Sequence, residues 1–148
     1  MLDMKIVPDT SVIIDGILSD KIEQGEIEEE IVIPEFVVDE LENQANKGRE
    51  TGYKGIEEIQ KIRELAEEKD LEFGFTGRKP TTEEIEMAHH GRIDALIRDI
   101  AEEIDATLFT ADRVQAKVAR AKGVPVEFFE KEITVEFNLE NYFDDNTM

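Results

Sequence analysis

Residues 4–14 have the sequence MKIVPDTSVII, in which two apolar runs flank a polar turn. The first run, residues 4–7, is typical of a short buried strand. Residues 9–11 form the turn, and the apolar residues of 12–18 predict a helix that closes near residues 16–19. A strand, a polar turn and a helix in this order are the start of an α/β unit.

The rest of the chain repeats this alternation. Residues 20–30 are acidic and predict a loop, and the glycines at 48, 52 and 55 predict a flexible stretch. Strands that alternate with helices predict an α/β fold with a mainly parallel sheet. The further predicted strands are 31–33, 71–75, 107–110 and 124–129, and the further helices are 35–45, 53–69, one that starts near 81, 92–104 and 113–122.

Length and composition limit the classes of protein that this chain can represent. Its 148 residues suit one domain, and 17 basic against 37 acidic residues give a net charge of −20. That charge argues against a protein that binds nucleic acid by bulk attraction alone. The absence of Cys excludes thiol catalysis, disulfides and thiolate zinc sites. Without an apolar run of about 18 residues or a signal peptide, we expect a cytoplasmic protein.

Two acidic residues follow predicted strands. Ligands of open α/β sheets bind outside the carboxyl ends of the strands. Asp9 follows the first strand directly, and Asp112 follows the strand 107–110 after one residue. Asp105 precedes that strand and is expected at the opposite edge. The simpler interpretation of both Asp9 and Asp112 is that each is a helix N-cap.

Two further acidic residues are selected by their angle around a helix, at about 100° per residue. Asp94 borders the apolar stripe of the predicted helix 92–104, whereas Asp99 lies about 140° away from that stripe. Glu40 lies one turn after Phe36 and shares its face. The simpler interpretations are a favourable charge in the first helical turn for Asp94 and a solvated side chain for Glu40.

The four carboxylates are more informative together than singly. If they met at one edge, they would repel one another strongly unless cations neutralised them. Hard oxygen ligands without a His cluster favour Mg²⁺ or Mn²⁺ over zinc. Two such ions about 3.5–4 Å apart hydrolyse phosphodiesters: one lowers the pKa of the attacking water and the other stabilises the departing 3′ oxygen. The pattern therefore predicts metal-dependent phosphodiester hydrolysis.

Four short stretches, taken in order, resemble the PIN-domain ribonucleases over essentially the whole chain. The resemblance implies a PIN-like three-layer fold, with a twisted sheet between helices, and Mg²⁺- or Mn²⁺-dependent cleavage of single-stranded RNA. It implies metal ligands and catalytic acids at Asp9, Glu40, Asp94 and Asp112, supported by the hydroxyls of Ser11 and Thr110. Ala111 replaces the Asn of many members. The stretches are IVPDTSVIIDG (6–16), IPEFVVDEL (33–41), IDALI (93–97) and LFTAD (108–112).

The long first motif and the Gly-Arg stretch from Gly48 are similar to the PIN domains of two larger architectures. One adds an RNA-binding TRAM domain, and the other is archaeal and adds an ATPase and a KH domain. The alternation of apolar and polar residues from Ile133 predicts an exposed or edge strand, followed by a polar tail, at 133–148. The resemblance implies a nuclease domain at 1–132 and a tail that leads into a domain absent from this chain. It implies RNA and a fused or associated ATPase or RNA-binding domain as partners. Family analogy alone suggests a homodimer.

Basic residues near the predicted site are candidates for RNA contacts. These residues are Arg49, Lys54, Arg113 and Lys117, and residues 113–122 contain four basic residues and no acidic one. A solvated helix face is the alternative. His89 and His90 could supply a base or a ligand, but adjacent helical positions point about 100° apart.

The same residues bear on three rival functions. A haloacid-dehalogenase-like phosphatase requires Asp-x-Asp after the first strand, where Ser11 takes the second place. A phospho-receiver domain requires an acidic pair there and a Lys after the last central strand, and residues 126–129 contain none. The serious alternative is a non-catalytic or partner-regulated PIN-like module that binds RNA or a fused ATPase domain. Metal-dependent turnover separates it from the nuclease.

Overall fold

The computed structural model describes residues 4–89 and 92–130. Within these ranges five strands form one sheet in the order β3-β2-β1-β4-β5, and all four strand pairs are parallel. This confirms the predicted α/β fold and the parallel sheet. The strands are β1 (Lys5–Pro8), β2 (Glu30–Ile33), β3 (Phe73–Phe75), β4 (Thr107–Thr110) and β5 (Val126–Phe128).

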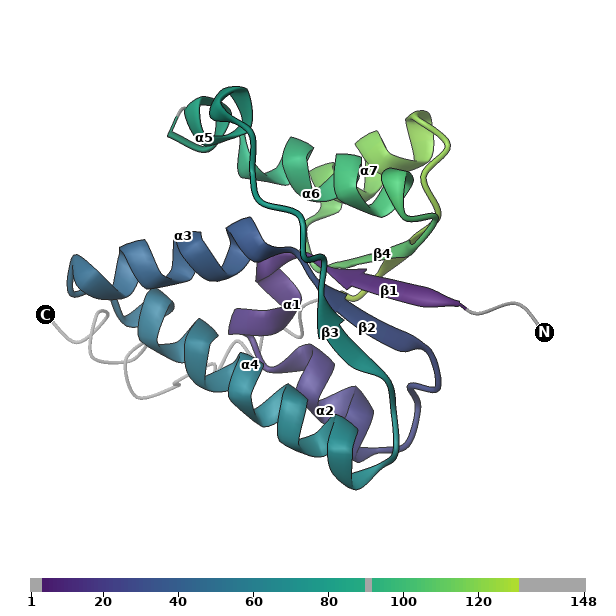
Figure 1. Ribbon diagram of the computed structural model, residues 1–148. Coiled ribbons are helices and arrows are strands. Elements are labelled where there is room, and N and C mark those ends of the chain that lie inside the picture. The colour runs from purple at the N-terminus through teal and green to yellow at the C-terminus, as the bar shows by residue number, and fades with distance from the viewer. Residues whose placement is uncertain (1–3, 90–91, 131–148) are drawn as a thin grey trace, which may run out of the picture.

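Helices cover both faces of this sheet, as Figure 1 shows: α6 and α7 lie on one side, and α1, α2 and α4 lie on the other. The arrangement has the three layers that were predicted. α3 leaves the end of β2 and packs along α4. In the described residues the helices are α1 (Thr10–Ile14), α2 (Ile17–Glu23), α3 (Glu35–Asn46), α4 (Glu50–Glu68), α5 (Thr82–His89), α6 (Ile93–Glu103) and α7 (Arg113–Ala121).

The core lies between the sheet and the apolar stripes of the helices. Ile6 and Val7 of the central strand β1 are 1% and 0% exposed. The stripe predicted for α6 is also buried, including Leu96, Ile97 and Ile100. Because β1 pairs with both β2 and β4, the carboxyl ends of these three strands meet at one edge of the sheet.

The prediction of a loop over residues 20–30 is wrong for its first part. α2 continues to Glu23, and Ile22 is 1% exposed in the core. Gly16 has a left-handed φ of 74°, which divides the helical stretch into α1 and α2. Apolar spacing from Ile17 to Ile22 therefore outweighs the acidic residues, which lie on the outer side of α2.

The flexible stretch predicted from three glycines is instead the contact between α3 and α4. α4 begins at Glu50, and both Gly52 and Gly55 are buried within it. A Cβ atom on Gly52 would overlap the backbone nitrogen of Ala45, and one on Gly55 would lie 2.6 Å from a methyl carbon of Leu41. Two of the glycines therefore allow close helix packing rather than mobility.

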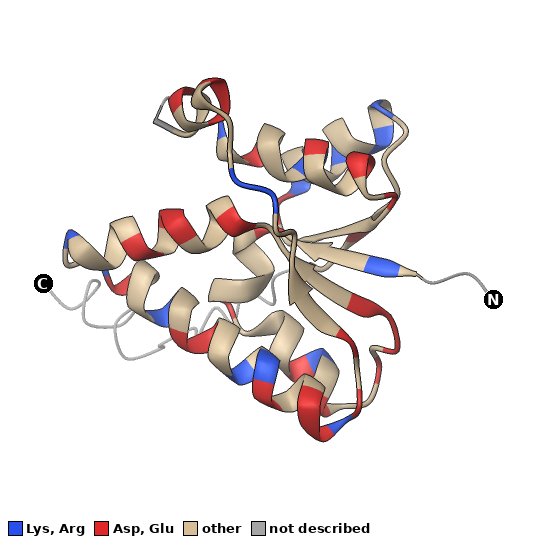
Figure 2. Ribbon diagram, viewed as in Figure 1, with Lys and Arg blue, Asp and Glu red and all other residues tan. Residues whose placement is uncertain are grey.

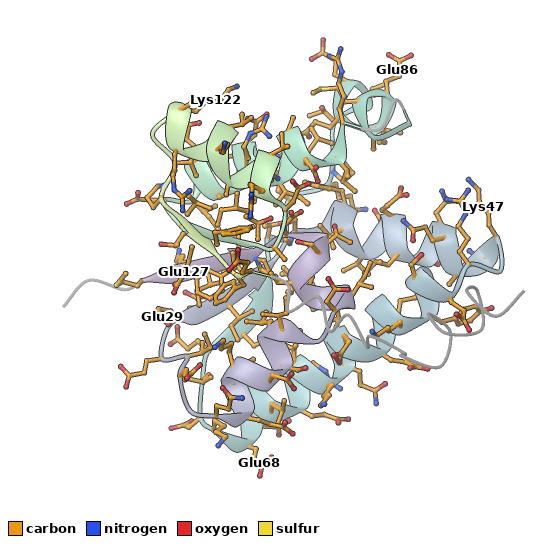
Figure 3. All side chains as sticks on the ribbon, turned by 180° about the vertical axis from the view of Figure 1, so that it is seen from behind. Glu29, Lys47, Glu68, Glu86, Lys122 and Glu127 are labelled. Atoms are coloured by element: carbon orange, nitrogen blue, oxygen red, sulfur yellow. The ribbon has the colours of Figure 1, made fainter. Side chains whose placement is uncertain are left out.

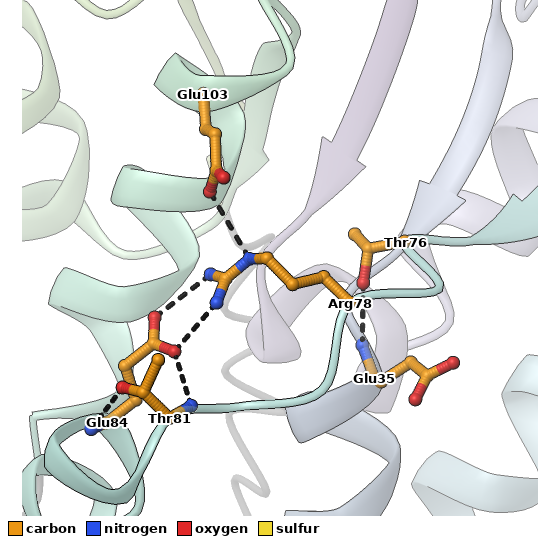
Figure 4. A network of polar contacts seen from close by, with 6 residues as sticks. All are labelled: Glu35, Thr76, Arg78, Thr81, Glu84 and Glu103. Atoms are coloured by element: carbon orange, nitrogen blue, oxygen red, sulfur yellow. Dashed lines mark hydrogen bonds and ion pairs between the residues drawn. The ribbon is translucent and has the colours of Figure 1, made fainter.

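The segment 76–81 between β3 and α5 is held by a polar network (Figure 4). Both terminal nitrogens of Arg78 bind the carboxylate of Glu84, at 2.8 and 2.9 Å, and its Nε lies 3.4 Å from Glu103 at the end of α6. Hydrogen bonds from Arg78 lower the pKa of Glu84 to about 2. Thr81 and Glu84 also exchange the two hydrogen bonds of a capping box, which explains why α5 begins here.

Two predictions concern parts of the chain that are not described. The strand and tail at 133–148 lie outside the described residues, as does His90.

Among the helices that are described, none is both long enough and apolar enough to cross a membrane.

Candidate active site

Asp9 lies at the carboxyl end of β1 and is 2% exposed. Its backbone N–H donates to the carbonyl of Phe109 at 2.7 Å, so the ends of β1 and β4 lie side by side. Its Oδ2 accepts hydrogen bonds from the hydroxyls of Thr110, at 2.7 Å, and Ser11, at 3.4 Å. Its Oδ1 accepts from the backbone N–H of Thr10 at 2.9 Å, which makes Asp9 the N-cap of α1 as well.

Asp112 follows β4 and caps α7. Its Oδ1 accepts from the backbone N–H groups of Val114, at 2.9 Å, and Gln115, at 3.2 Å. Both bonds use one oxygen, so Oδ2 has no hydrogen-bond partner among the described residues. Thr110 connects the two caps, because its hydroxyl donates to Asp9 and accepts from the backbone N–H of Asp112 at 3.0 Å. The N-cap interpretation is therefore correct for both aspartates, and it leaves a face of Asp112 open.

Asp94 lies in the first turn of α6 and joins the other two aspartates through its charge. Burial raises the pKa of Asp9 from 3.8 to about 6, and the charges of Asp94 and Asp112 add to that rise. Burial also raises the pKa of Asp94, followed by the charge of Asp112. The charges of Asp94 and Asp112 therefore act on Asp9, and that of Asp112 acts on Asp94, at the edge where β1 and β4 end and α6 begins.

Glu40 is not part of this electrostatic group. It is half-buried on α3, and its Oε1 accepts a hydrogen bond from Gln44, one turn later, at 3.3 Å. Its charge is not among those that raise the pKa of Asp9 or Asp94. Position around the helix does separate Glu40 and Asp94, both half-buried, from Asp39 and Asp99, which are exposed.

The donor set suits a hard divalent cation in its chemistry. The pKa values of Asp9 and Asp94 are raised in part by neighbouring carboxylate charges, which a bound cation would compensate. The hydroxyl of Thr10, next to Asp9, is a buried oxygen without a partner. However, the described residues contain no group of three or more His, Asp or Glu side chains gathered closely enough to hold a metal ion. The three aspartates therefore interact through their charges without forming a closed set of ligands.

Two residues at this edge, Gln115 and Arg98, were missed by the sequence analysis. Gln115 of α7 is 2% exposed, and its Nε2 donates to the backbone carbonyl of Asp94 at 2.9 Å. Arg98 of α6 donates to Oε1 of Gln115 at 2.6 Å. The signal that could have found them is a Gln on the apolar face of a predicted helix, with an Arg one turn after Asp94.

The predicted RNA-contact residues lie on two helices and the loop between α3 and α4. All four are exposed: Arg49 before α4, Lys54 in α4, and Arg113 and Lys117 in α7. Arg113 forms an ion pair with Glu130 at 3.5 Å. Figure 2 shows acidic residues spread over α3, α4 and the loop before β2, and basic residues at the far end of α7. That end carries Lys122, which points away from the body of the molecule in Figure 3.

Comparison with known proteins gives relatives with several domain architectures. The chain is 46% identical, over its whole length, to an uncharacterized KH and PIN-domain containing protein of Methanocaldococcus jannaschii, of which it covers 23%. It is 27% identical, over 97% of its length, to the Holliday junction branch migration ATPase PINA of Sulfolobus acidocaldarius, of which it covers 26%. It is 30% identical, over 80% of its length, to an uncharacterized PIN and TRAM-domain containing protein of Thermus thermophilus, of which it covers 32%. The chain thus spans less than a third of each of these curated relatives.

A solved structure and a family model agree with these relatives. A domain of a functionally unknown protein from Methanocaldococcus jannaschii superimposes with a TM-score of 0.78 at 47% identity, over 86% of this chain and 91% of that one. The PIN domain family model matches residues 6–121. Members of this family are generally nucleases that use divalent metal ions. The strand ends, the three aspartates and the match over most of the chain lead to one conclusion: this chain belongs to the PIN domain family.

Proposed function

We propose that this chain is a Mg²⁺- or Mn²⁺-dependent endoribonuclease that hydrolyses phosphodiester bonds of single-stranded RNA in the cytoplasm. The observation that carries the proposal is the group of Asp9, Asp94 and Asp112 at the carboxyl edge of a parallel sheet, with a pKa of about 6 for Asp9. An acidic group whose pKa is raised by burial and by neighbouring charges is typical of a functional site. Family membership supports the nuclease activity.

Each proposed site residue has a role that follows from its position. Asp9, Asp94 and Asp112 would hold the metal, and Glu40, in the middle of α3, would join the ligand set if its bond to Gln44 were released. The hydroxyls of Ser11 and Thr110 orient the Asp9 carboxylate through the bonds at 3.4 and 2.7 Å. A bound divalent ion would supply an activated water and stabilise the negative charge of the departing oxygen.

The charges around the two basic stretches favour α7 over α4 as the RNA contact. Between Arg113 and Lys122 there is no acidic residue, and Arg113, Lys117 and Arg120 are spaced so that they share one face of the helix. Lys54 instead lies among Glu50, Glu57 and Glu58 on α4. Because Asp112 caps α7, the basic face of α7 begins next to the proposed site. This face could guide a phosphate backbone to the site.

The alternative is a non-catalytic module, and two observations favour it. The net charge of −20 weakens any general attraction to RNA. The chain covers less than a third of each of these relatives, which include KH, TRAM and ATPase proteins. The proposal assigns the nuclease unit to residues 1–132, and the alternative is that contact with a partner domain of the KH, TRAM or ATPase kind controls its activity.

The test is cleavage of an internally structured, end-labelled RNA with a single-stranded region, in Mn²⁺ and in EDTA. Asp112→Asn is the informative variant, because Asn caps a helix as well as Asp does and the fold is therefore preserved. Asp99→Asn, exposed on α6, removes the same charge and is the matched control. Cleavage that requires Mn²⁺ and Asp112 but not Asp99 supports the proposal. Equal cleavage by Asp112→Asn refutes the site, and turnover in EDTA refutes the mechanism.

The same experiment should include single-stranded DNA of identical sequence. The name of the Sulfolobus acidocaldarius relative refers to a DNA junction, so DNA is the natural competitor substrate. Preference for the RNA strand supports the proposed substrate, and equal or faster cleavage of DNA contradicts it. If neither strand is cleaved while Mn²⁺ still binds, the non-catalytic alternative replaces the nuclease.

A further inference from the structure

We propose that Gln115 and Arg98 are positioning residues that set the distance between Asp94 and Asp112, and through it the affinity of the site for a divalent metal ion. The inference rests on the proposed function because it assumes that these two aspartates share a metal. It concerns residues of α6 and α7 that are not themselves among the proposed metal ligands.

Gln115 bonds to both aspartate-bearing elements, with its side chain to one and with its backbone to the other. Its Nε2 donates to the backbone carbonyl of Asp94 at 2.9 Å, and its backbone N–H donates to Oδ1 of Asp112 at 3.2 Å. A single residue thus connects the first turn of α6 to the N-cap of α7. Its amide oxygen is also used, because Arg98 donates to it at 2.6 Å.

These bonds fix the orientation of the Gln115 amide. The amide has one acceptor and one donor group, and swapping them would place its oxygen against the carbonyl of Asp94 and its nitrogen against the guanidinium of Arg98. Because the amide nitrogen faces an acceptor and the amide oxygen faces a donor, the side chain has one favourable orientation. Since Gln115 is 2% exposed, water cannot replace either partner.

Burying the polar amide of Gln115 at this position costs folding free energy unless the amide forms hydrogen bonds. The neighbouring buried residues on the same face of α7 are Ala116 and Ala119, at 1% and 0% exposed. A small apolar residue would continue that stripe and would pack against α6 without a hydrogen bond. Arg98 adds to this free-energy cost of burial, because its Nε is buried and has no hydrogen-bond partner among the described residues. A buried polar chain of this kind specifies one relative position of two helices, which apolar packing alone does less well.

The hydrogen bonds of Gln115 fix the relative position of two carboxylates, those of Asp94 and Asp112, which repel each other. Asp94 and Asp112 lie on separate helices, and each carries a negative charge that disfavours the approach of the other. The bond from Gln115 holds the backbone of Asp94, so it limits how far α6 can shift from the cap of α7. Residues that orient metal ligands in this way typically change metal affinity 10–100-fold when they are replaced.

The test compares Gln115→Met with a matched control. Met keeps the length and the unbranched shape of Gln but removes both side-chain bonds. Ala119→Gly, buried on the same helix and away from the aspartates, destabilises α7 without touching the chain of bonds. Two quantities are measured for each protein: the increase in melting temperature caused by Mn²⁺ alone, and the Mn²⁺ concentration for half-maximal RNA cleavage.

We expect Gln115→Met to need 10–100-fold more Mn²⁺ in both measurements, with cleavage largely recovered at saturating Mn²⁺. Arg98→Met should give a smaller change in the same direction, and Arg98→Lys, which keeps a donor for Gln115, should restore most of it. Ala119→Gly should respond to Mn²⁺ like the wild type even though its melting temperature is lower. A response of Gln115→Met equal to the wild type overturns the inference, and so does an equal loss in Ala119→Gly.

Failure of the proposed function gives a different result. If the wild type cleaves no RNA but Mn²⁺ raises its melting temperature, and raises that of Gln115→Met less, the positioning role holds and the ribonuclease does not. If the wild type cleaves RNA and Gln115→Met needs no additional Mn²⁺, the function holds and the positioning role is wrong. A wild type whose stability does not respond to Mn²⁺ overturns both.

Discussion

Asp9→Asn should stabilise the metal-free protein at neutral pH. Burial and two neighbouring charges raise the pKa of Asp9 from 3.8 to about 6, so its charged form is disfavoured in the fold. One pKa unit is equivalent to about 1.4 kcal/mol, and the ionised side chain therefore costs about 3 kcal/mol of folding free energy at pH 7. For a chain of this length, that corresponds to an increase of about 6–12 °C in melting temperature when the charge is removed.

Asn at this position keeps the hydrogen bonds that hold the loop. Its oxygen can still accept from the backbone N–H of Thr10, and its nitrogen can donate to the hydroxyl of Thr110, which can accept as well as donate. The expected gain in the free energy of unfolding is thus close to the cost of the buried charge. It is smaller if the hydrogen bonds of the Asn side chain are longer or less well aligned than those of Asp9. An unfavourable Asn geometry would appear equally at all pH values and can be subtracted.

The pH dependence gives the sign of the effect. Because the folded protein binds the proton of Asp9 more tightly than the unfolded chain, the stability of the wild type falls as pH rises from about 4 to about 6. Below pH 4 the carboxyl is protonated in both states and the two proteins should differ little. Above pH 6 the full difference of about 3 kcal/mol should be present and constant.

Denaturant unfolding in EDTA between pH 4 and pH 8 measures this difference. Asp99→Asn, on the exposed face of α6, controls for the general relief of repulsion in a chain of net charge −20. Adding Mn²⁺ at one thousand times its dissociation constant should reverse the order, because an ion that binds only the folded wild type then stabilises it by about 4.1 kcal/mol. The reasoning is refuted if Asp9→Asn and wild type have the same stability throughout, or if Asp99→Asn gains as much as Asp9→Asn.

Three further variants test other parts of the structure. Gly52→Ala should destabilise the protein by at least about 2 kcal/mol, because its Cβ would overlap the backbone of α3, whereas Gly25→Ala, in open space, should cost only the strain of a positive φ; thermal unfolding compares them. Glu84→Gln should be less stable than wild type at pH 7, and this difference should vanish as pH falls from about 4.5 to about 2, where the lowered pKa of Glu84 allows protonation; acid titration followed by circular dichroism measures it, and a constant difference would contradict the role of the ion pair. Lys117→Ala should weaken RNA binding and reduce its salt dependence by about one ion, whereas Lys54→Ala should change neither; fluorescence anisotropy over a range of salt concentrations checks this, and the reverse order would place the RNA on α4.

The local sequence pattern predicted most of the secondary structure, because helices and strands depend largely on residues a few positions apart in the chain. The alternation of apolar runs with turns indicated five of the strands, and the spacing of Ile93, Leu96 and Ile97 indicated α6. The same signals were ambiguous where one residue type serves two purposes. Gly52 and Gly55 suggested flexibility, but their small size serves the contact between α3 and α4.

The candidate site was predicted in part. Position after a strand and angle around a helix selected Asp9, Asp94 and Asp112, whose charges the structure brings into mutual range. Neither rule indicates how close side chains from separate helices come, and the structure leaves Glu40 bonded to Gln44 on its own helix.

The amino-acid sequence by itself determined the alternation of strands and helices and which acidic residues follow strand ends, because both depend on periodicity within a few residues. Only the tertiary structure decided that Asp9 is buried enough to raise its pKa to about 6, and that Gln115 bonds to Asp94, twenty-one residues earlier in the chain. Burial and hydrogen bonds of this kind arise from the packing of α6, α7 and β1 against one another. No local pattern encodes that packing, because each partner is supplied by a different part of the chain.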